Sequence, residues 1–101
     1  TIYVDIDETI CFYEQEHELD SKKDYSLAIP NFTNIEKINK LYDSGNRIVY
    51  WTARGSRSGI DWHDFTEKQL KEWGAKFNLL KCDKPYYDIF IDDRNKRIEE
   101  I

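Results

Sequence analysis

The chain has 101 residues and a formal net charge of −5, with seven Tyr, five Phe and three Trp. This length is enough for one domain over residues 1–101 with a modest core, and the aromatic content argues against disorder. The acidic balance disfavours a nucleic-acid surface, which would be basic, and no stretch approaches the roughly 20 apolar residues that a membrane span needs. The two cysteines match no metal or disulfide spacing, so we expect a reduced, cytoplasmic setting.

A short apolar run at the start of the chain leads into two carboxylates. Residues 2–4 predict a buried strand, and Asp5 and Asp7 follow two residues apart. Positions i and i+2 of a strand share a face, so the two acids point to one place, or converge there if the chain turns. Two acids aimed at one place repel each other unless a cation lies between them or one holds a proton. We therefore predict a ligand site at this strand end, with a solvated turn as the alternative.

Residues 10–28 are charged and show no clear period. Loops of this length inside a compact domain are usually functional or mobile. Two interpretations stay open for this segment. It is either a flap over the site, with a short hairpin in it, or a solvated excursion.

A helix and a second buried strand follow. Asn31 after Pro30 is a plausible N-cap, apolar residues then recur at helical spacing, and Gly45 predicts the helix end. Residues 47–51 predict a strand that runs into Thr52-Ala53-Arg54-Gly55. A hydroxyl, a small residue and a glycine at a strand end suit a close approach of the backbone to an anion.

The next unit repeats this order. Asp61 is predicted to cap a second helix that ends at Gly74, and residues 75–80 should contain a third strand. The apolar face of this helix is predicted from its large side chains, which are Trp62, Phe65, Leu70 and Trp73.

The last part of the chain carries a lysine and an acid pair. Lys84 lies in a turn, residues 87–91 predict a fourth strand that runs into Asp92 and Asp93, and residues 95–101 predict a helical fragment. Alternating strands and helices predict an α/β fold with a parallel sheet.

The predicted strand ends together suit phosphate chemistry. Several carboxylates, a hydroxyl and one lysine favour Mg²⁺ with a phosphorylated ligand, and a free carboxylate could attack phosphorus to give an aspartyl phosphate. A zinc site is conceivable from the chain's cysteines and histidines, but no spacing supports it. Its members would be Cys11, His17, His63 and Cys82.

These residues resemble the four motifs of the haloacid dehalogenase (HAD) superfamily of phosphohydrolases, in order and spacing along essentially the whole chain. The motifs are Asp5-Ile6-Asp7-Glu8-Thr9, Thr52, Lys84 and Asp92-Asp93. The chain also looks like small capless members associated with capsule and surface-polysaccharide biosynthesis. That narrower likeness rests on Thr52–Gly55, Gly59–Trp62, Gln69-Leu70, Trp73-Gly74, Lys84-Pro85 and Ile91–Asp93.

The resemblance implies a Rossmann-like sheet flanked by helices, with residues 10–28 as the only cover over the site. It implies a phosphomonoesterase in which Asp5 is the nucleophile. Asp7 would be the general acid and then the base, and would give its backbone carbonyl to Mg²⁺. A site without a cap is open, so a sugar phosphate or related metabolite fits it, and a second subunit or a fused domain could close it.

The resemblance also assigns the remaining motif residues. Thr52, with Ala53 beside it, and Lys84 would bind the transferring phosphoryl group. Asp92 would ligate Mg²⁺ together with Asp5, and Asp93 would assist directly or through water. Contacts beyond the phosphate are expected from Arg54, Arg57, Asp61 and Trp62, although Trp62 equally suits the helix core.

Two positions depart from the family pattern, and two other functions remain. Glu8 stands where the family often has Gly, and Asp83 precedes the lysine where relatives often have Gly.

A phospho-acceptor signalling module uses a similar residue set, but the order of the motifs argues against it. A catalytically silent binding domain with the same fold is the other alternative.

Overall fold

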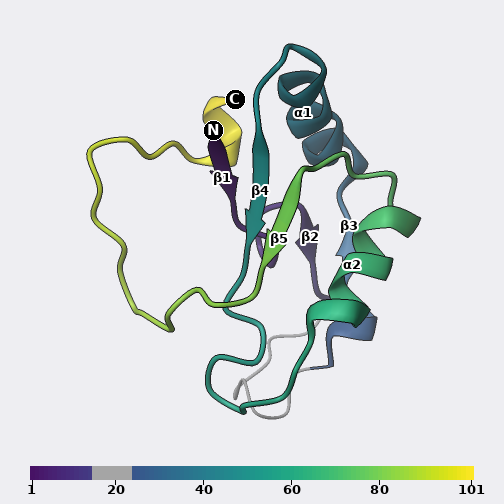
Figure 1. The fold of residues 1–101 in the computed structure, drawn as a ribbon, viewed down its shortest axis with the longest axis vertical. Coiled ribbons are helices and arrows are strands. Elements are labelled where there is room, and N and C mark those ends of the chain that lie inside the picture. The colour runs from purple at the N-terminus through teal and green to yellow at the C-terminus, as the bar shows by residue number, and fades with distance from the viewer. Residues whose placement is uncertain (15–23) are drawn as a thin grey trace.

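A three-stranded parallel sheet forms the centre of the computed structural model, which describes residues 1–14 and 24–101. Its strands are β1 (Ile2–Val4), β4 (Ile48–Trp51) and β5 (Leu79–Lys81), in the order β1-β4-β5 (Figure 1). The predicted α/β class with a parallel sheet is therefore confirmed for these three strands. Most of the predicted flap, residues 15–23, lies outside the described residues.

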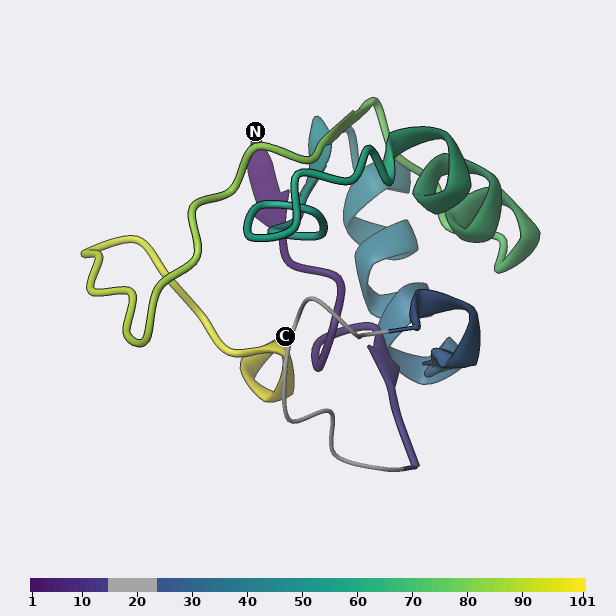
Figure 2. The same cartoon turned by 90° about the horizontal axis from the view of Figure 1, so that it is seen from below.

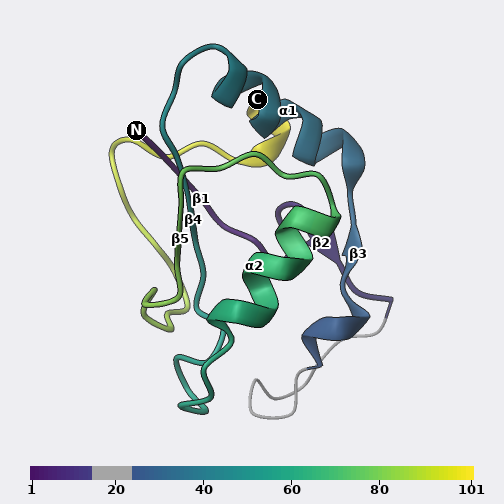
Figure 3. The same ribbon diagram turned by 45° about the vertical axis from the view of Figure 1, so that its right-hand side comes forward.

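Two helices connect these strands and lie on one side of the sheet (Figure 3). They are α1 (Phe32–Asp43) and α2 (His63–Glu72). Both connections step across the sheet in the same direction, and crossovers of the usual right-handed kind then place both helices on the same face. The core lies between this face and the helices, and its buried apolar side chains include Val4, Ile6, Ile10, Ile35, Ile38, Ile48, Tyr50, Leu70 and Leu80.

The predicted ends of α1 are confirmed. The side chain of Asn31 accepts a hydrogen bond from the backbone N–H of Asn34 at 3.0 Å, which satisfies one donor that the helix leaves unpaired. Ser44 closes the helix, and Gly45 follows with φ +99°, a conformation that favours glycine.

The second helix starts two residues later than Asp61 and buries a different face. The Asp61 carboxylate accepts a hydrogen bond from the backbone N–H of His63 at 2.9 Å, while Trp62 takes the N-cap position without a side-chain hydrogen bond. Thr66, Gln69 and Leu70 are the buried residues of α2. The predicted apolar face is confirmed at Leu70 and at Trp73, which packs against the core, but Phe65 is exposed. Polar residues share the buried face because this helix packs against a buried charged side chain from the loop after β4.

The ends of the predicted flap pair with each other. β2 (Cys11–Phe12) and β3 (Ile29–Pro30) form a small antiparallel ribbon, and the 3₁₀ turn η2 (Tyr25–Leu27) precedes β3. A short hairpin was one of the two expectations for this segment, and the ribbon confirms its base. Because β2 follows Asp7 by only a few residues, the ribbon lies beside the carboxyl end of β1.

The fourth predicted strand and the C-terminal helix are not formed. Residues 82–97 contain no strand or helix and swing away from the sheet, and only the 3₁₀ turn η3 (Ile98–Glu100) follows them (Figure 1). The apolar residues at 87–91 have a high preference for a β-strand, but a sequence pattern does not show which neighbouring strand they would pair with. Ile91 is 91% exposed and Ile89 is 76% exposed.

Within the described residues, no helix is long and apolar enough to cross a membrane.

The loop after β4 depends on a glycine that has no room for a side chain. Gly55 has φ +85°, and a Cβ there would collide with the carbonyl oxygen of Ile60. Gly59 also has positive φ, at +75°, but a Cβ there would meet nothing within 4 Å. We expect Gly55→Ala to lower the free energy of unfolding by clearly more than Gly59→Ala, whose cost should be about 1–2 kcal/mol. Urea unfolding of both variants measures this, and equal losses would contradict the collision.

Candidate functional site

The predicted site residues of the first three motifs lie where the parallel strands end. Val4 pairs with Tyr50, and Tyr50 pairs with Leu80, so the residues that follow the three strands meet at one edge of the sheet. Asp5 comes from the end of β1, Thr52 from the end of β4, and Lys84 from the chain beyond β5. In open α/β sheets this edge is where ligands bind.

Asp5 is held between a lysine and a hydroxyl. Lys84 Nζ lies 3.5 Å from Asp5 Oδ1, and the hydroxyl of Thr9 donates to Asp5 Oδ2 at 3.3 Å. The Asp5 side chain is 41% exposed and that of Lys84 only 11%. Burial raises the pKa of Asp5, the charge of Lys84 opposes that rise, and the charge of Asp7 adds to it. The carboxylate is therefore reachable from solvent and faces a cation.

Thr52 and Lys84 are joined through the backbone. The N–H of Lys84 donates to the carbonyl of Thr52 at 3.2 Å, and the N–H of Thr52 donates to the carbonyl of Lys81 at 2.9 Å. The Thr52 side chain is buried, and its hydroxyl accepts from the N–H of Arg54 at 3.2 Å. Ala53 lies between them and is partly buried. These bonds join Thr52 to the backbone of Lys84, whose ammonium group contacts Asp5.

Asp7 faces a second cation, which is buried. Arg54 donates from Nε to Asp7 Oδ2 at 3.0 Å and from a terminal nitrogen to Oδ1 at 2.9 Å, a two-pronged ion pair. The side chain of Arg54 is completely buried, and that of Asp7 is 15% exposed. Burial alone would lower the pKa of Arg54, but the hydrogen bonds and charge of Asp7 hold it above its ordinary value. Arg54 is therefore charged in the folded chain.

The same carboxylate also accepts from the flap ribbon. The hydroxyl of Tyr13 donates to Asp7 Oδ1 at 2.6 Å, and the thiol of Cys11 lies 3.5 Å from the same oxygen. Burial and the charge of Asp7 raise the pKa of Tyr13 well above its ordinary value, so it stays a donor. Sequence analysis did not single out Tyr13, because nothing in its neighbourhood indicates that the ribbon folds back on Asp7.

Arg54 does not face a substrate. Its other terminal nitrogen donates to Thr66 at 3.1 Å and to Gln69 at 2.8 Å, and its guanidinium lies 4.5 Å from the ring centre of Tyr25. The expected substrate contact at Arg54 is therefore corrected to a structural role. Thr66 was missed, and Gln69 was noted only as part of the narrower likeness, although their spacing with Leu70 places all three on one helix face.

The other three expected substrate contacts make contacts within the chain. Arg57 is exposed, with its guanidinium 4.6 Å from the ring centre of Tyr86. Asp61 accepts the helix N–H described above, and Trp62 packs edge-on against Tyr25 at 4.9 Å between ring centres. The aromatic contact supports the core alternative for Trp62.

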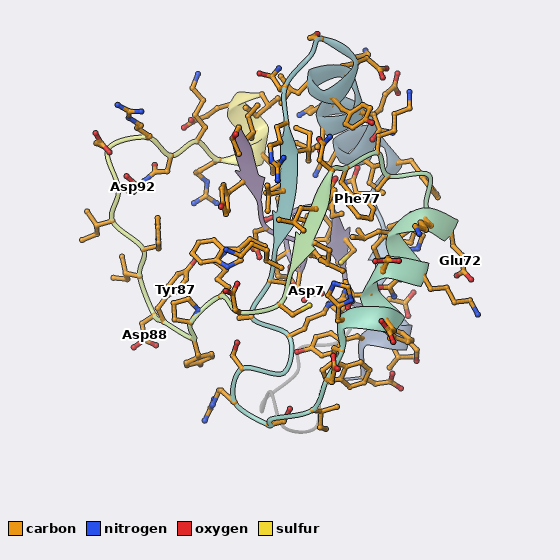
Figure 4. The ribbon with its side chains drawn as sticks, in the orientation of Figure 1. Asp7, Glu72, Phe77, Tyr87, Asp88 and Asp92 are labelled. Carbon is orange, nitrogen blue, oxygen red and sulfur yellow. The ribbon has the colours of Figure 1, made fainter. Side chains whose placement is uncertain are left out.

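The structure does not bring Asp92 and Asp93 to Asp5. Figure 4 shows Asp92 on the outer part of the loop after β5, far from Asp7 at the strand ends. Within residues 1–14 and 24–101 no three carboxylate, His or Cys side chains gather as a metal site. A Mg²⁺ ion held by Asp5, Asp7, Asp92 and Asp93 together does not fit one chain in this fold. The reason is the missing strand at 87–91, which was expected to carry the acid pair to the sheet.

Glu8 adopts an unusual backbone conformation beside the acid pair. Among the described residues it is the only non-glycine with positive φ, at +64°. Such conformations are strained for most side chains and cluster at functional sites. This explains physically why a glycine would suit the position.

Comparisons with known proteins found a similar fold but gave no information on function. No known family model matches the chain, and no match was found among curated proteins. The chain is similar to a crystal structure of a target protein from Vibrio cholerae, with a TM-score of 0.78 at 22% sequence identity, over 98% of this chain and 84% of that chain. At this identity the likeness shows the fold alone.

Removing the side chain of Arg54 should leave the buried carboxylate of Asp7 without its cationic partner. We expect Arg54→Met to lower the free energy of unfolding by about 3–5 kcal/mol, because Asp7 then loses its partner. Adding Asp7→Asn should recover part of that loss, since no unpaired charge remains. The control Arg97→Met removes a side chain that is 82% exposed and should cost less than about 0.5 kcal/mol. Chemical unfolding measures all three, and equal losses for the two arginines would contradict this account.

We expect the ionised side chain of Asp5 to lower the stability of the folded protein. Its pKa is raised in the folded chain, so its ionised form destabilises the protein at neutral pH, and stability is regained as pH falls toward the ordinary Asp value of about 3.9. We expect Asp5→Asn to raise Tm at pH 7 by a few degrees at most, because solvent screens the partly exposed carboxylate. The gain should shrink as the pH is lowered.

The control for this measurement is Asp43→Asn. It removes an exposed carboxylate that pairs with Lys76 at 2.9 Å, so its Tm should stay or fall at pH 7. Thermal unfolding from pH 4 to pH 7 gives both trends. A lower Tm for Asp5→Asn at pH 7 would show that the pair with Lys84 outweighs burial.

Proposed function

We propose that this chain is a phosphomonoesterase of the HAD type that acts on a small phosphorylated metabolite such as a sugar phosphate. The observation that carries the proposal is the contact between Asp5 and Lys84 at the carboxyl edge of the sheet, with Thr52 beside them. A carboxylate, an ammonium group and a hydroxyl at one strand edge form a nucleophile with a phosphate cradle. The resemblance of the sequence motifs assigns these three residues the same roles.

The reaction proceeds in two displacements on phosphorus. In the first, a carboxylate oxygen of Asp5 bonds to phosphorus, the bond from phosphorus to the substrate oxygen breaks, and the leaving alkoxide takes a proton from solvent at the open edge of the sheet. In the second, water attacks the aspartyl phosphate and loses a proton, inorganic phosphate leaves, and Asp5 is restored. Lys84 and Thr52 orient the phosphoryl group and offset its charge in both steps.

The environment of Asp7 suits one of its two proposed roles better. Arg54 donates two hydrogen bonds to its carboxylate, which favours the ionised form. An ionised Asp7 accepts the proton of the attacking water in the second displacement. In the first displacement the ion pair opposes a protonated Asp7, so solvent rather than Asp7 protonates the leaving alkoxide.

The family also implies Mg²⁺, held by Asp5, the Asp7 backbone carbonyl and the acid pair. One described chain supplies only the first part of that set, because Asp92 and Asp93 lie on the outer loop. The steps assigned to this chain therefore involve only its own side chains. The open edge of the sheet, with Asp5 partly exposed, suits a substrate whose phosphate enters from solvent.

A silent binding domain is the second candidate, and one observation favours it. The acid pair is separated from Asp5, which would leave a metal site incomplete in a single chain. Such a domain would bind a phosphorylated ligand through Lys84 without turning it over.

Phosphate release from a panel of phosphoesters tests the proposal. The panel holds an aryl phosphate, several sugar phosphates and nucleotides, each with and without Mg²⁺. We expect release from at least one of these substrates, lowered about a thousandfold or more by Asp5→Asn because the nucleophile is lost.

Asp64→Asn is the matched control, since Asp64 is an exposed acid in the first turn of α2, and its rate should stay within about twofold of the unmodified chain. Release by Asp5→Asn at the unmodified rate would refute the nucleophile. Absence of release from every substrate, with phosphate-competed ligand binding intact, would favour the silent domain.

A further inference from the structure

The face of the sheet that points away from α1 and α2 carries aromatic and charged side chains. Both helices lie to one side of the strands, also when the molecule is seen from below (Figures 2 and 3). Side chains alternate along a strand, and Tyr50 and Leu80 belong to the core on the helix side. Their neighbours Trp51 and Lys81, which are partners in the register of β4 and β5, therefore point to the opposite face.

Four side chains on this face contact one another, and we call Tyr3, Trp51, Lys81 and Asp83 the outer cluster. The rings of Tyr3 and Trp51 meet edge to face with 5.5 Å between their centres, and the indole N–H of Trp51 donates to Asp83 Oδ1 at 2.8 Å. Asp83 Oδ2 lies 3.8 Å from Lys81 Nζ, which lies 5.8 Å from the ring centre of Tyr3. These contacts orient the indole and place a carboxylate and an ammonium group beside it.

The outer cluster adjoins the proposed phosphate cradle through Lys84. The ammonium nitrogen of Lys84 lies 3.5 Å from Asp5 Oδ1 and 5.6 Å from the ring centre of Trp51. In-line displacement on phosphorus directs the leaving group away from the attacking oxygen of Asp5. A leaving group whose phosphate is bound by Lys84 therefore meets the other surroundings of this lysine, and the indole of Trp51 is one of them.

The chemistry of the outer cluster suits a sugar ring. Ligand sites combine aromatic surface with a few polar groups that fix the orientation of the ligand. The side chains of Asp83 and Lys81 are 68% and 36% exposed, so a ligand can reach both. A carboxylate accepts about four hydrogen bonds, so Asp83 can accept from sugar hydroxyls in addition to the indole N–H of Trp51. The C–H face of the same sugar would pack on the indole.

We infer that Trp51 and Asp83 form the subsite for the non-phosphate part of the substrate, and that this subsite favours a phosphorylated sugar ring over an acyclic phosphoester. The inference rests on the proposed function in one respect, because the phosphate has to lie at Lys84. It assigns the specificity contacts to the outer face of the sheet. Arg54 and Trp62, for which the sequence suggested such contacts, pack on the helix side instead.

The indole N–H signals of the three tryptophans test this binding without any turnover. They are recorded by proton–nitrogen NMR on the Asp5→Asn protein, and adding Trp51→Phe or Trp62→Phe identifies two of them by their loss. We expect a hexose phosphate to shift the Trp51 signal in a saturable way. Inorganic phosphate and glycerol phosphate should shift it clearly less at the same concentration. An unmoved Trp51 signal in a large excess of hexose phosphate, or a shift confined to the Trp62 signal, would overturn the subsite.

Substrate preference gives a second test, measured as kcat/KM for the hexose phosphate divided by kcat/KM for glycerol phosphate. This ratio does not depend on how much of a variant is folded. Trp51→Leu should lower the ratio about tenfold or more, because the contact with the sugar is lost while the phosphate cradle is kept. Trp51→Phe keeps an aromatic ring and should retain most of the preference. Asp83→Ala should lower the ratio as well, since the sugar hydroxyls lose their acceptor.

Trp62→Leu is the matched control for these variants. It removes an indole that packs beside Tyr25 and should leave the preference unchanged. Hydrolysis of both esters with an unaltered ratio in Trp51→Leu would overturn the subsite and leave the phosphatase standing. A shift of the Trp51 signal by the hexose phosphate, without hydrolysis of any phosphoester, would refute the phosphatase and leave the subsite standing as a binding site.

Discussion

The ion pair between Arg54 and Asp7 is the interaction on which the rest of the site depends. It joins the chain after β1 to the loop after β4, and through Thr66 and Gln69 it extends to α2. The guanidinium is fully buried, so neither charge could remain in place without the other. The position of Asp7 is thus set by a helix that is distant in sequence, and α2 carries polar groups on its buried face for this reason.

A second cation completes this arrangement. Asp5 and Asp7 are close enough to disfavour each other's charge, and the sequence alone suggested that a metal ion relieves the repulsion. In the structure Lys84 faces Asp5 and Arg54 faces Asp7, so each acid has its own cation. The two cations differ in exposure and in geometry, and this separates a reachable carboxylate from one that is locked in place. An asymmetry of this kind is what a nucleophile and a neighbouring proton acceptor require.

Local rules predicted the parts of the fold that local interactions decide. Asn31 and Gly45 mark the ends of α1 because capping and positive φ are properties of a few consecutive residues. The meeting of Asp5, Thr52 and Lys84 was also predictable, since parallel strand ends share one edge. The partner of Arg54 was not, because a loop arginine reads equally as a ligand contact or a buried ion pair until α2 is placed. Likewise, the residue types at 87–91 show a preference for β-strand but not where that segment lies relative to the sheet.

That last disagreement is informative because a segment with strand-forming residues lies outside the sheet there. Natural sequences are largely consistent across levels, and departures concentrate where a chain meets something else. Residues 87–91 combine high strand preference with high exposure, and β1 offers an unpaired edge in the same molecule. Residues 87–91 therefore combine a strand preference that the described fold leaves unpaired with a position beside an unpaired strand edge. The chain that carries them leaves the site at Lys84, whose ammonium group contacts Asp5.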